Sequence, residues 1–151
     1  MEVLSHSLEE FSAVASDFAL SLKKSAEGAR LVTLSGELGS GKTTFVQSVA
    51  RALGISEAVT SPTFVIEKIY NLKDQEFNKL IHIDAYRLEN SLQLINLGWR
   101  DILSENGNVI FLEWPEKVAD ILPSERANVF FQSLGEDERG INIEEIKSNQ
   151  T

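Results

Sequence analysis

The chain contains no cysteine, only two histidines and no long apolar run. The absence of cysteine excludes disulfide bonds, thiolate metal sites and a cysteine nucleophile. No apolar stretch approaches the roughly 18 residues that a membrane-spanning helix needs, and the amino terminus lacks the three regions of a signal peptide. We therefore expect a cytoplasmic protein that makes no contact with a membrane.

Basic residues are also scarce. The sequence has 14 Lys and Arg against 23 Asp and Glu, which gives a net charge of −9 and a pI near 4.7. A protein that captures nucleic acid on its own surface usually presents a basic face. Direct binding of DNA or RNA is therefore disfavoured, and we expect another protein to hold any nucleic acid involved.

The remaining composition is typical of a globular domain, with 42% hydrophobic and 25% charged residues. A length of 151 residues predicts one domain over residues 1–151. The last residues, 147–151, are expected to form a loose tail.

One segment matches a phosphate-binding motif at every fixed position. The run Gly36 to Thr43, GELGSGKT, fits G-x-x-x-x-G-K-[ST], between a strand pattern over 30–35 and a helix pattern over 42–53. Glycines let backbone amides approach phosphate oxygens, and the helix amino terminus favours anions. The Lys42 ammonium suits the β and γ phosphates, and the Thr43 hydroxyl suits Mg²⁺. The predicted nucleotide-binding residues are Gly36, Glu37, Leu38, Gly39, Ser40, Gly41, Lys42, Thr43 and Thr44.

A second segment, TSPTF, lies shortly after the expected helix. Pro62 disfavours the α conformation at Ser61, so the hydroxyls here lie on an extended loop. Such a loop can sense the γ phosphate and the metal, as nucleotide switches do, but an ordinary turn would use the same residues. The candidate switch comprises Thr60, Ser61, Pro62, Thr63 and Phe64.

Two buried strand patterns each end in a carboxylate. The runs LIHID and VIFLE end at Asp84 and Glu113. In open α/β sheets, ligands bind outside the carboxyl ends of the strands, so either acid could lie at the metal or its water. Lys42, Asp84 and Glu113 are therefore the catalytic candidates, and Thr43 and the two acids are the metal-binding candidates. Each acid could instead cap the next helix.

Three further residues are candidates for supporting the site. His82 lies two residues before Asp84, so the two side chains should share one face of the sheet. His82 could be a structural histidine or a base. Arg87 is the one evident arginine within these segments, and Trp114 directly follows Glu113.

The remaining sequence patterns predict the other helices and strands, and with them the fold class. Leu8, Phe11, Val14, Ala15, Phe18 and Leu22 recur at helical spacing after a capping box at Ser7, and Gly28 is expected to end that helix. An edge strand is expected over 2–5, a broken helix over 88–105, a short helix over 116–122, and hairpins pairing 65–70 with 79–84 and 126–134 with 141–146. We predict an α/β, P-loop NTPase-like three-layer sandwich, with a mostly parallel central sheet and antiparallel hairpin additions.

Together, GELGSGKTT, SPTF, HIDAYRL and LEWPE, in this order and spacing, resemble the bacterial TsaE (YjeE) family. The resemblance spans about Leu8 to Arg126. It implies a small P-loop ATPase required for N6-threonylcarbamoyladenosine at position 37 of tRNAs that read ANN codons. It also implies two protein partners, TsaB and TsaD, and contact with tRNA only through them.

The resemblance further implies roles for individual residues. Lys42 and Thr43 would hold phosphates and Mg²⁺, residues 60–64 would be the first switch, and Glu113 would be the Walker B-like acid. With no evident arginine finger except Arg87, we expect slow ATP hydrolysis that partners accelerate.

Two other functions remain open. A small-molecule P-loop kinase would need an acceptor site and an arginine-rich lid, whereas the six arginines are scattered. A GTPase switch would normally carry an Asn-Lys-x-Asp signature, which is absent. That absence favours ATP over GTP.

Overall fold

The computed structural model describes residues 1–57, 59 and 67–147. The candidate switch at 60–64 lies outside the described residues, as do residues 65 and 66 of the first expected hairpin and most of the expected tail.

Within the described residues, seven strands form one mixed sheet in the order β1-β7-β6-β2-β5-β4-β3. The strands are β1 (Glu2–Ser5), β2 (Arg30–Ser35), β3 (Glu67–Asn71), β4 (Lys79–Asp84), β5 (Asn108–Glu113), β6 (Arg126–Ser133) and β7 (Arg139–Ile146). The central strands β6, β2, β5 and β4 pair in parallel, while β1, β7 and β3 add antiparallel pairings at the edges. This arrangement confirms the predicted parallel centre with antiparallel hairpin additions.

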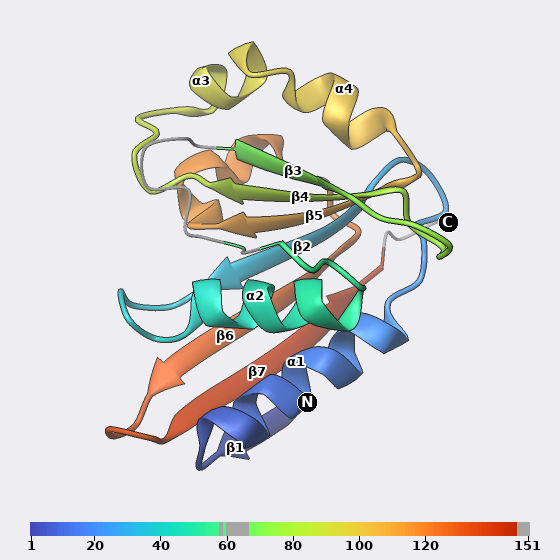
Figure 1. Ribbon diagram of the computed structural model, residues 1–151. Helices are drawn as coiled ribbons and strands as arrows, with labels where there is room; N and C mark the ends of the chain where they lie inside the picture. Colours follow the sequence, from blue (N-terminus) through green and yellow to red (C-terminus); the bar gives the residue numbers. More distant parts are fainter. Residues whose placement is uncertain (58, 60–66, 148–151) are drawn as a thin grey trace.

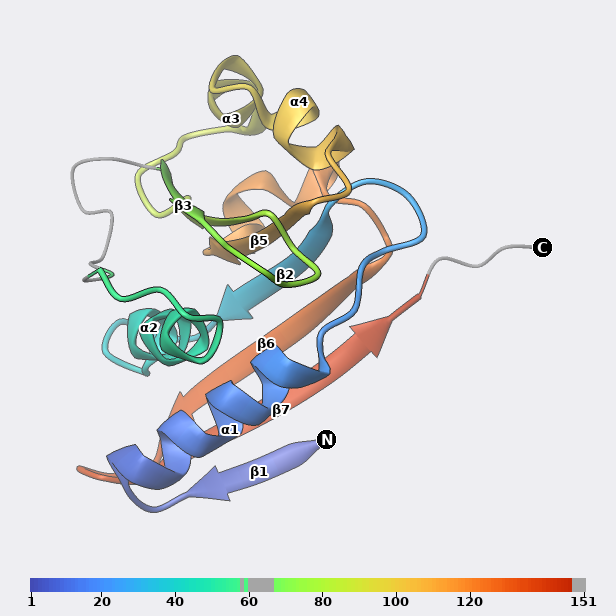
Figure 2. The ribbon, with the colours of Figure 1, turned by 45° about the vertical axis from the view of Figure 1, so that its right-hand side comes forward.

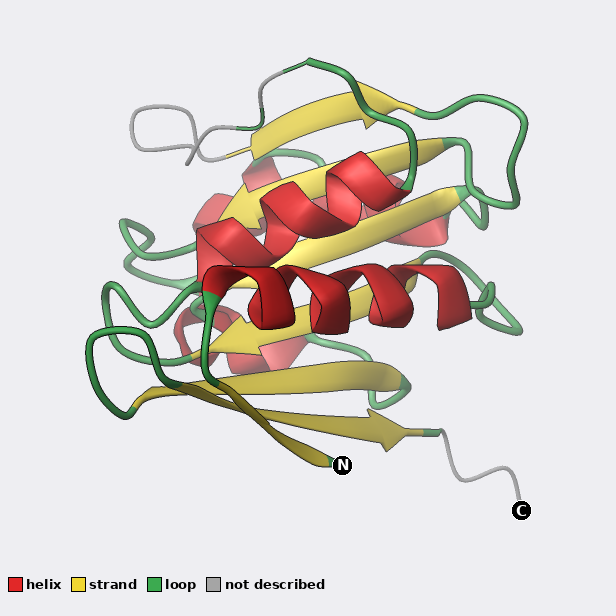
Figure 3. Ribbon diagram, turned by 60° about the horizontal axis from the view of Figure 1, so that its bottom comes forward, coloured by secondary structure: helices red, strands yellow, loops and turns green. Residues whose placement is uncertain are grey.

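Helices cover both faces of the sheet (Figures 1 and 3). They are α1 (Leu8–Ser21), α2 (Lys42–Ala52), α3 (Ser91–Asn96), α4 (Trp99–Ser104) and the 3₁₀ helix η1 (Pro115–Ile121). The pair α1 and α2 packs on one face, and the other three pack on the opposite face. Within the described part of the chain, no helix has the length and apolar character needed to span a membrane.

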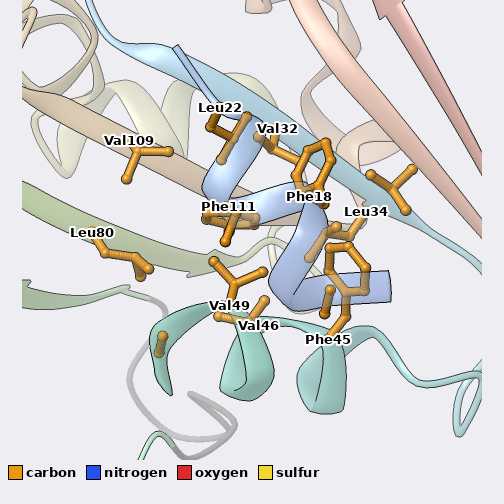
Figure 4. Packing of buried hydrophobic residues seen from close by; sticks show 14 of the residues in the cluster. Phe18, Leu22, Val32, Leu34, Phe45, Val46, Val49, Leu80, Val109 and Phe111 are labelled. Carbon is orange, nitrogen blue, oxygen red and sulfur yellow. The ribbon is translucent and has the colours of Figure 1, made fainter. Parts of the chain in front are cut away.

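Alternation along the central strands fills two separate cores. On β2 and β5, Val32, Leu34, Val109 and Phe111 face α1 and α2, whereas Leu31, Ile110 and Leu112 face the other helices. Figure 4 shows the first of these cores, in which Phe18 and Phe45 bring the two helices onto the sheet. Each fully buried side chain of this size stabilises the fold by about 1.5–3 kcal/mol, so the central strands are fixed firmly.

The first helix begins as predicted but ends earlier. The Ser7 hydroxyl accepts from the Glu10 amide at 3.1 Å, while the Glu10 carboxylate accepts from the amide of His6, one residue before the cap. The helix ends at Ser21 instead of Gly28. Gly28 instead serves a tight turn, because its φ is +68° and a Cβ there would lie 2.5 Å from the Leu103 carbonyl oxygen.

Leu8 corrects the predicted apolar stripe of this helix. Phe11, Ala15 and Phe18 are buried, but the Leu8 residue is 68% exposed. Leu8 is the first residue of the helix and lines the cavity described below, so spacing alone placed it wrongly in the core.

Candidate functional site

The loop between β2 and α2 forms the centre of the site, at the carboxyl edge of the sheet (Figure 1). Gly41 precedes the first residue of α2 with a φ of +111°, and a Cβ there would lie 2.7 Å from the Phe11 ring. A side chain at this position would therefore be strained and obstructed. Among the described residues, no side chain caps α2 at Gly41. Its first amides are thus available to an anion.

Lys42 is held in place by its own loop. Its ammonium group donates to the Gly36 carbonyl and lies 3.6 Å from the centroid of the Trp114 ring. Burial lowers the pKa of Lys42, although the carboxylates of Glu113 and Asp84 oppose that shift. The two carboxylates favour the charged form of this lysine, whereas its burial opposes it.

Glu113 contacts two of the other predicted residues. The Thr43 hydroxyl lies 3.3 and 3.5 Å from its two carboxylate oxygens, and His82 Nε2 lies 2.6 Å from Oε2. Both Glu113 and His82 are buried, the histidine completely. Strand register explains the contact, since His82 pairs with Phe111 on the neighbouring strand and so faces the same side as Glu113.

Asp84 lies beside this group. It pairs with Glu113 in the β4–β5 register, and its Oδ1 accepts from the Tyr86 amide at 3.0 Å. Burial raises the pKa of Asp84, and the Glu113 carboxylate adds to the shift, while the Tyr86 amide and the charges of His82 and Lys42 lower it. The structure thus brings both acids together and sets the Thr43 hydroxyl against Glu113. Which of them holds a metal stays a prediction.

Trp114 has an unusual backbone. Its φ is +61°, in the left-handed region, which costs a residue with a side chain about 1–3 kcal/mol. This conformation places the indole over Lys42 and 5.0 Å from the Tyr86 ring, centroid to centroid. Arg87 lines the same cavity. Backbone strain of the kind found at Trp114 is typical of functional positions.

Apart from Gly36 and His82, the predicted residues described above line one cavity of about 590 Å³, a volume within the range of small-molecule sites, about 300–1,000 Å³. The cavity also reaches residues that belong to no motif. Leu8 and Phe11 come from α1, and Glu136, Asp137 and Arg139 come from the β6–β7 turn and the start of β7. Sequence reasoning missed this half, and an exposed leucine or an acidic turn offers no signal that could have found it.

The residues fit a magnesium ion that phosphates also hold. The described part of the chain has no group of three His, Cys, Asp or Glu side chains arranged to bind a metal. Mg²⁺ in nucleotide sites usually keeps several waters and uses one or two protein oxygens with the phosphates. The Thr43 hydroxyl beside the Glu113 carboxylate is such a donor set.

The sheet order, the loop after β2 and the carboxylates at the ends of β4 and β5 define the class: an α/β protein with a P-loop NTPase-like fold. A family model described as "Threonylcarbamoyl adenosine biosynthesis protein TsaE" matches residues 5–141. The chain belongs to the TsaE family.

Individual relatives agree. Proteins named "tRNA threonylcarbamoyladenosine biosynthesis protein TsaE" include one from Bacillus subtilis, 40% identical over 74% of this chain and 66% of that protein. Another, from Rickettsia bellii, is 33% identical over 94% of this chain and 93% of its own length. The crystal structure of Bacillus subtilis YdiB superposes with a TM-score of 0.76 at 31% identity, covering 97% of this chain and 86% of that one.

Proposed function

We propose that this protein binds MgATP in the P-loop cavity and hydrolyses it. We further propose that this ATPase supports TsaB and TsaD, in the cytoplasm, in forming threonylcarbamoyladenosine in tRNA. Membership of the TsaE family supports the pathway. The observation that carries the ATPase is the juxtaposition of Thr43, Glu113 and Lys42 at the start of α2, with distances of 3.3 and 3.5 Å between the Thr43 hydroxyl and the carboxylate.

In this proposal, the loop binds the triphosphate by its backbone amides and by Lys42. The ammonium group leaves the Gly36 carbonyl and donates to phosphate oxygens, where it stabilises the charge that develops during transfer. Thr43 and Glu113 are the residues that would hold Mg²⁺. Bound there, Mg²⁺ would neutralise charge on the β and γ phosphates.

The carboxylates position water for in-line attack. Glu113 is fixed by His82, and Asp84 lies next to it on β4. One of the two accepts a hydrogen bond from the attacking water and so orients its lone pair toward phosphorus. Because an arginine finger is not evident in the motifs apart from Arg87, we expect slow turnover by the isolated protein and faster turnover with TsaB and TsaD.

Acidic composition supports an indirect role for tRNA. With a net charge of −9, the chain has too few cations to neutralise a run of phosphates by itself. The partners would therefore hold the tRNA, and this protein would supply nucleotide-dependent control.

Phosphate release tests the reaction class. We expect MgATP to release inorganic phosphate without an added acceptor, slowly for the isolated protein and faster when TsaB and TsaD are added. Rapid release that the partners do not change would contradict partner control. Turnover only with a small-molecule acceptor would favour the kinase, and tighter calorimetric binding of MgGTP than of MgATP would favour the GTPase.

A further inference from the structure

Three charged side chains of the site lie close together, yet the cation pairs with neither acid. Figure 2 shows the arrowheads of β2 and β5 at the edge of the sheet where the chain enters α2. Lys42 begins α2, and Asp84 and Glu113 end β4 and β5. Unlike charges in a buried site attract each other strongly. Within the described residues, however, no ion pair joins Lys42 to either carboxylate.

The two carboxylates have partners of their own. Glu113 Oε2 lies 2.6 Å from His82 Nε2 and 3.3 Å from the Thr43 hydroxyl. Asp84 Oδ1 accepts from the Tyr86 amide at 3.0 Å. These contacts hold the acids at the ends of their strands. They do not explain the place of the ammonium group, because a lysine side chain is flexible enough to follow a carboxylate.

The indole of Trp114 gives this ammonium group a different partner. Lys42 Nζ lies 3.6 Å from the ring centroid, well within the roughly 6 Å over which a cation is attracted to an aromatic face. It also donates to the Gly36 carbonyl. The attraction between a cation and a ring is stronger where both are withdrawn from water, and Lys42 is only 5% exposed. The ring can therefore compete with the carboxylates for the ammonium group.

The ring is itself fixed in place. The Trp114 amide donates to the Leu34 carbonyl at 3.3 Å, which ties the residue to the strand before the P-loop. The Tyr86 ring packs against the indole with its centroid 5.0 Å away and its plane tilted by 50°. Tyr86 therefore contacts Trp114 through its side chain and Asp84 through its amide. One residue thus holds both the aromatic ring and the nearby acid.

We propose that Trp114 is a positioning residue for Lys42, whose ammonium group its ring keeps apart from Glu113 and Asp84 until phosphate binds. Without the ring, the ammonium group would pair with a carboxylate, and neither group would then be free for a ligand. Tyr86 supports this role by holding the ring. The inference rests on the proposed function only in taking phosphate as the ligand.

NMR spectroscopy of the full chain tests whether the ring holds the side chain. Protons over an aromatic face are shifted upfield by the ring current, so we expect upfield Lys42 Hε resonances in the ligand-free protein. Their absence from the spectrum of Lys42→Arg assigns them. They should move downfield when magnesium tripolyphosphate, which has the phosphates of ATP but no base, is added. Ordinary Lys42 shifts in the ligand-free protein would overturn the proposal.

Two substitutions of Trp114 separate the aromatic face from apolar bulk, since both keep a side chain on the same strained backbone. Calorimetry should show that Trp114→Leu weakens binding of magnesium tripolyphosphate about tenfold, whereas Trp114→Phe weakens it only about threefold. Trp99→Phe is the matched control, because Trp99 is buried in the same core but does not line the cavity. It should lower thermal stability and leave the affinity unchanged.

Removing the acids tests whether the ring acts by keeping unlike charges apart. In a background with both Glu113→Gln and Asp84→Asn, the ammonium group has no carboxylate of β4 or β5 to join. Trp114→Leu should therefore weaken tripolyphosphate binding less in this background than in the wild type. The comparison is made within each background, so the direct effect of losing the acids cancels. An equal loss in both backgrounds would overturn the proposal.

The outcomes also separate this proposal from the proposed function. If the wild-type protein binds no magnesium tripolyphosphate, the proposed function fails, and the role of Trp114 fails with it. If the wild-type protein binds it and Trp114→Leu binds it as tightly, the positioning role is wrong while the phosphate site stands. The same conclusion follows if Trp114→Phe binds no more tightly than Trp114→Leu.

Discussion

The two ends of the cavity are built in opposite ways. At the P-loop end, Lys42, His82 and Glu113 are buried. Lys42 donates to the Gly36 carbonyl, and His82 Nε2 lies 2.6 Å from Glu113 Oε2. At the other end, Leu8 and Leu38 are mostly exposed and line the cavity with a surface turn. Control of charge requires groups withdrawn from water, whereas apolar contact with a ligand requires only apolar surface. The difference predicts that substitutions at the P-loop end change chemistry and those at the other end change only affinity.

The largest expected effect is on hydrolysis. Glu113→Gln keeps the shape of the side chain and a contact with His82, but it removes the negative charge. We expect phosphate release to fall about 10²–10³-fold, the loss typical of a group that acts in the transition state, with MgATP still bound. Asp84→Asn is the matched comparison. If Asp84→Asn lowered phosphate release more than Glu113→Gln does, Asp84 on β4 would be the principal catalytic acid in place of Glu113 on β5.

Lys42→Ala should weaken binding of MgATP and of tripolyphosphate alike, by about 100-fold, because a charge-assisted contact to phosphate is lost. Circular dichroism should be unchanged, since within residues 1–57, 59 and 67–147 the ammonium contacts the Gly36 carbonyl and the Trp114 ring, neither of which needs the lysine to fold. Lys79→Ala, an exposed lysine on β4, is the control. Selective loss of ATP binding, with tripolyphosphate retained, would mean that the two ends are not separate.

His82→Gln tests whether the buried contact to Glu113 positions the acid. We expect kcat to fall about 10-fold, as is common when a partner of a metal-side ligand is removed, with KM for MgATP nearly unchanged. His6→Gln should have no effect, because His6 is exposed and far from β5 in the sheet order. A change in thermal stability without a change in kcat would assign His82 a structural role only.

Substitution of Glu67, which lies on β3 and does not line the cavity, is expected to have the smallest effect. Burial raises its pKa, and within the described residues its Oε2 has no hydrogen-bond partner. The ionised carboxylate therefore costs stability at neutral pH, and this cost disappears as pH falls toward the ordinary glutamate pKa of 4.5.

Glu67→Gln should stabilise the fold at pH 7 by less than about 0.5 kcal/mol, because the group is only half-buried. Denaturant unfolding at neutral and acidic pH should show the gain shrinking as pH falls, with MgATP binding unaltered. A gain that grows in acid would reverse the assigned sign.

The arrangement at the P-loop end could be predicted from the sequence, because the motif requires particular residues at fixed spacing. The Gly36 to Thr43 motif, the strands ending at Asp84 and Glu113, and the shared face of His82 all follow from local pattern. The central strand β2 follows in the same way, at the predicted bounds.

The other end could not be predicted, because it arises from tertiary contacts. Its spacing predicts that Leu8 lies in the core, yet this residue is 68% exposed. The turn at 134–138 lies near the start of α1 because β1 pairs with β7, whose paired residues are more than 130 positions apart. The early end of α1 at Ser21 likewise depends on how the chain returns to the sheet.

A crystal structure with Mg²⁺ and a non-hydrolysable ATP analogue tests the account most directly. We predict phosphates on the amides at the start of α2, Lys42 released from the Gly36 carbonyl, and the metal beside Thr43 with Glu113 or its water. A nucleotide whose phosphates lie away from the P-loop, with Lys42 still on the Gly36 carbonyl, would contradict the account.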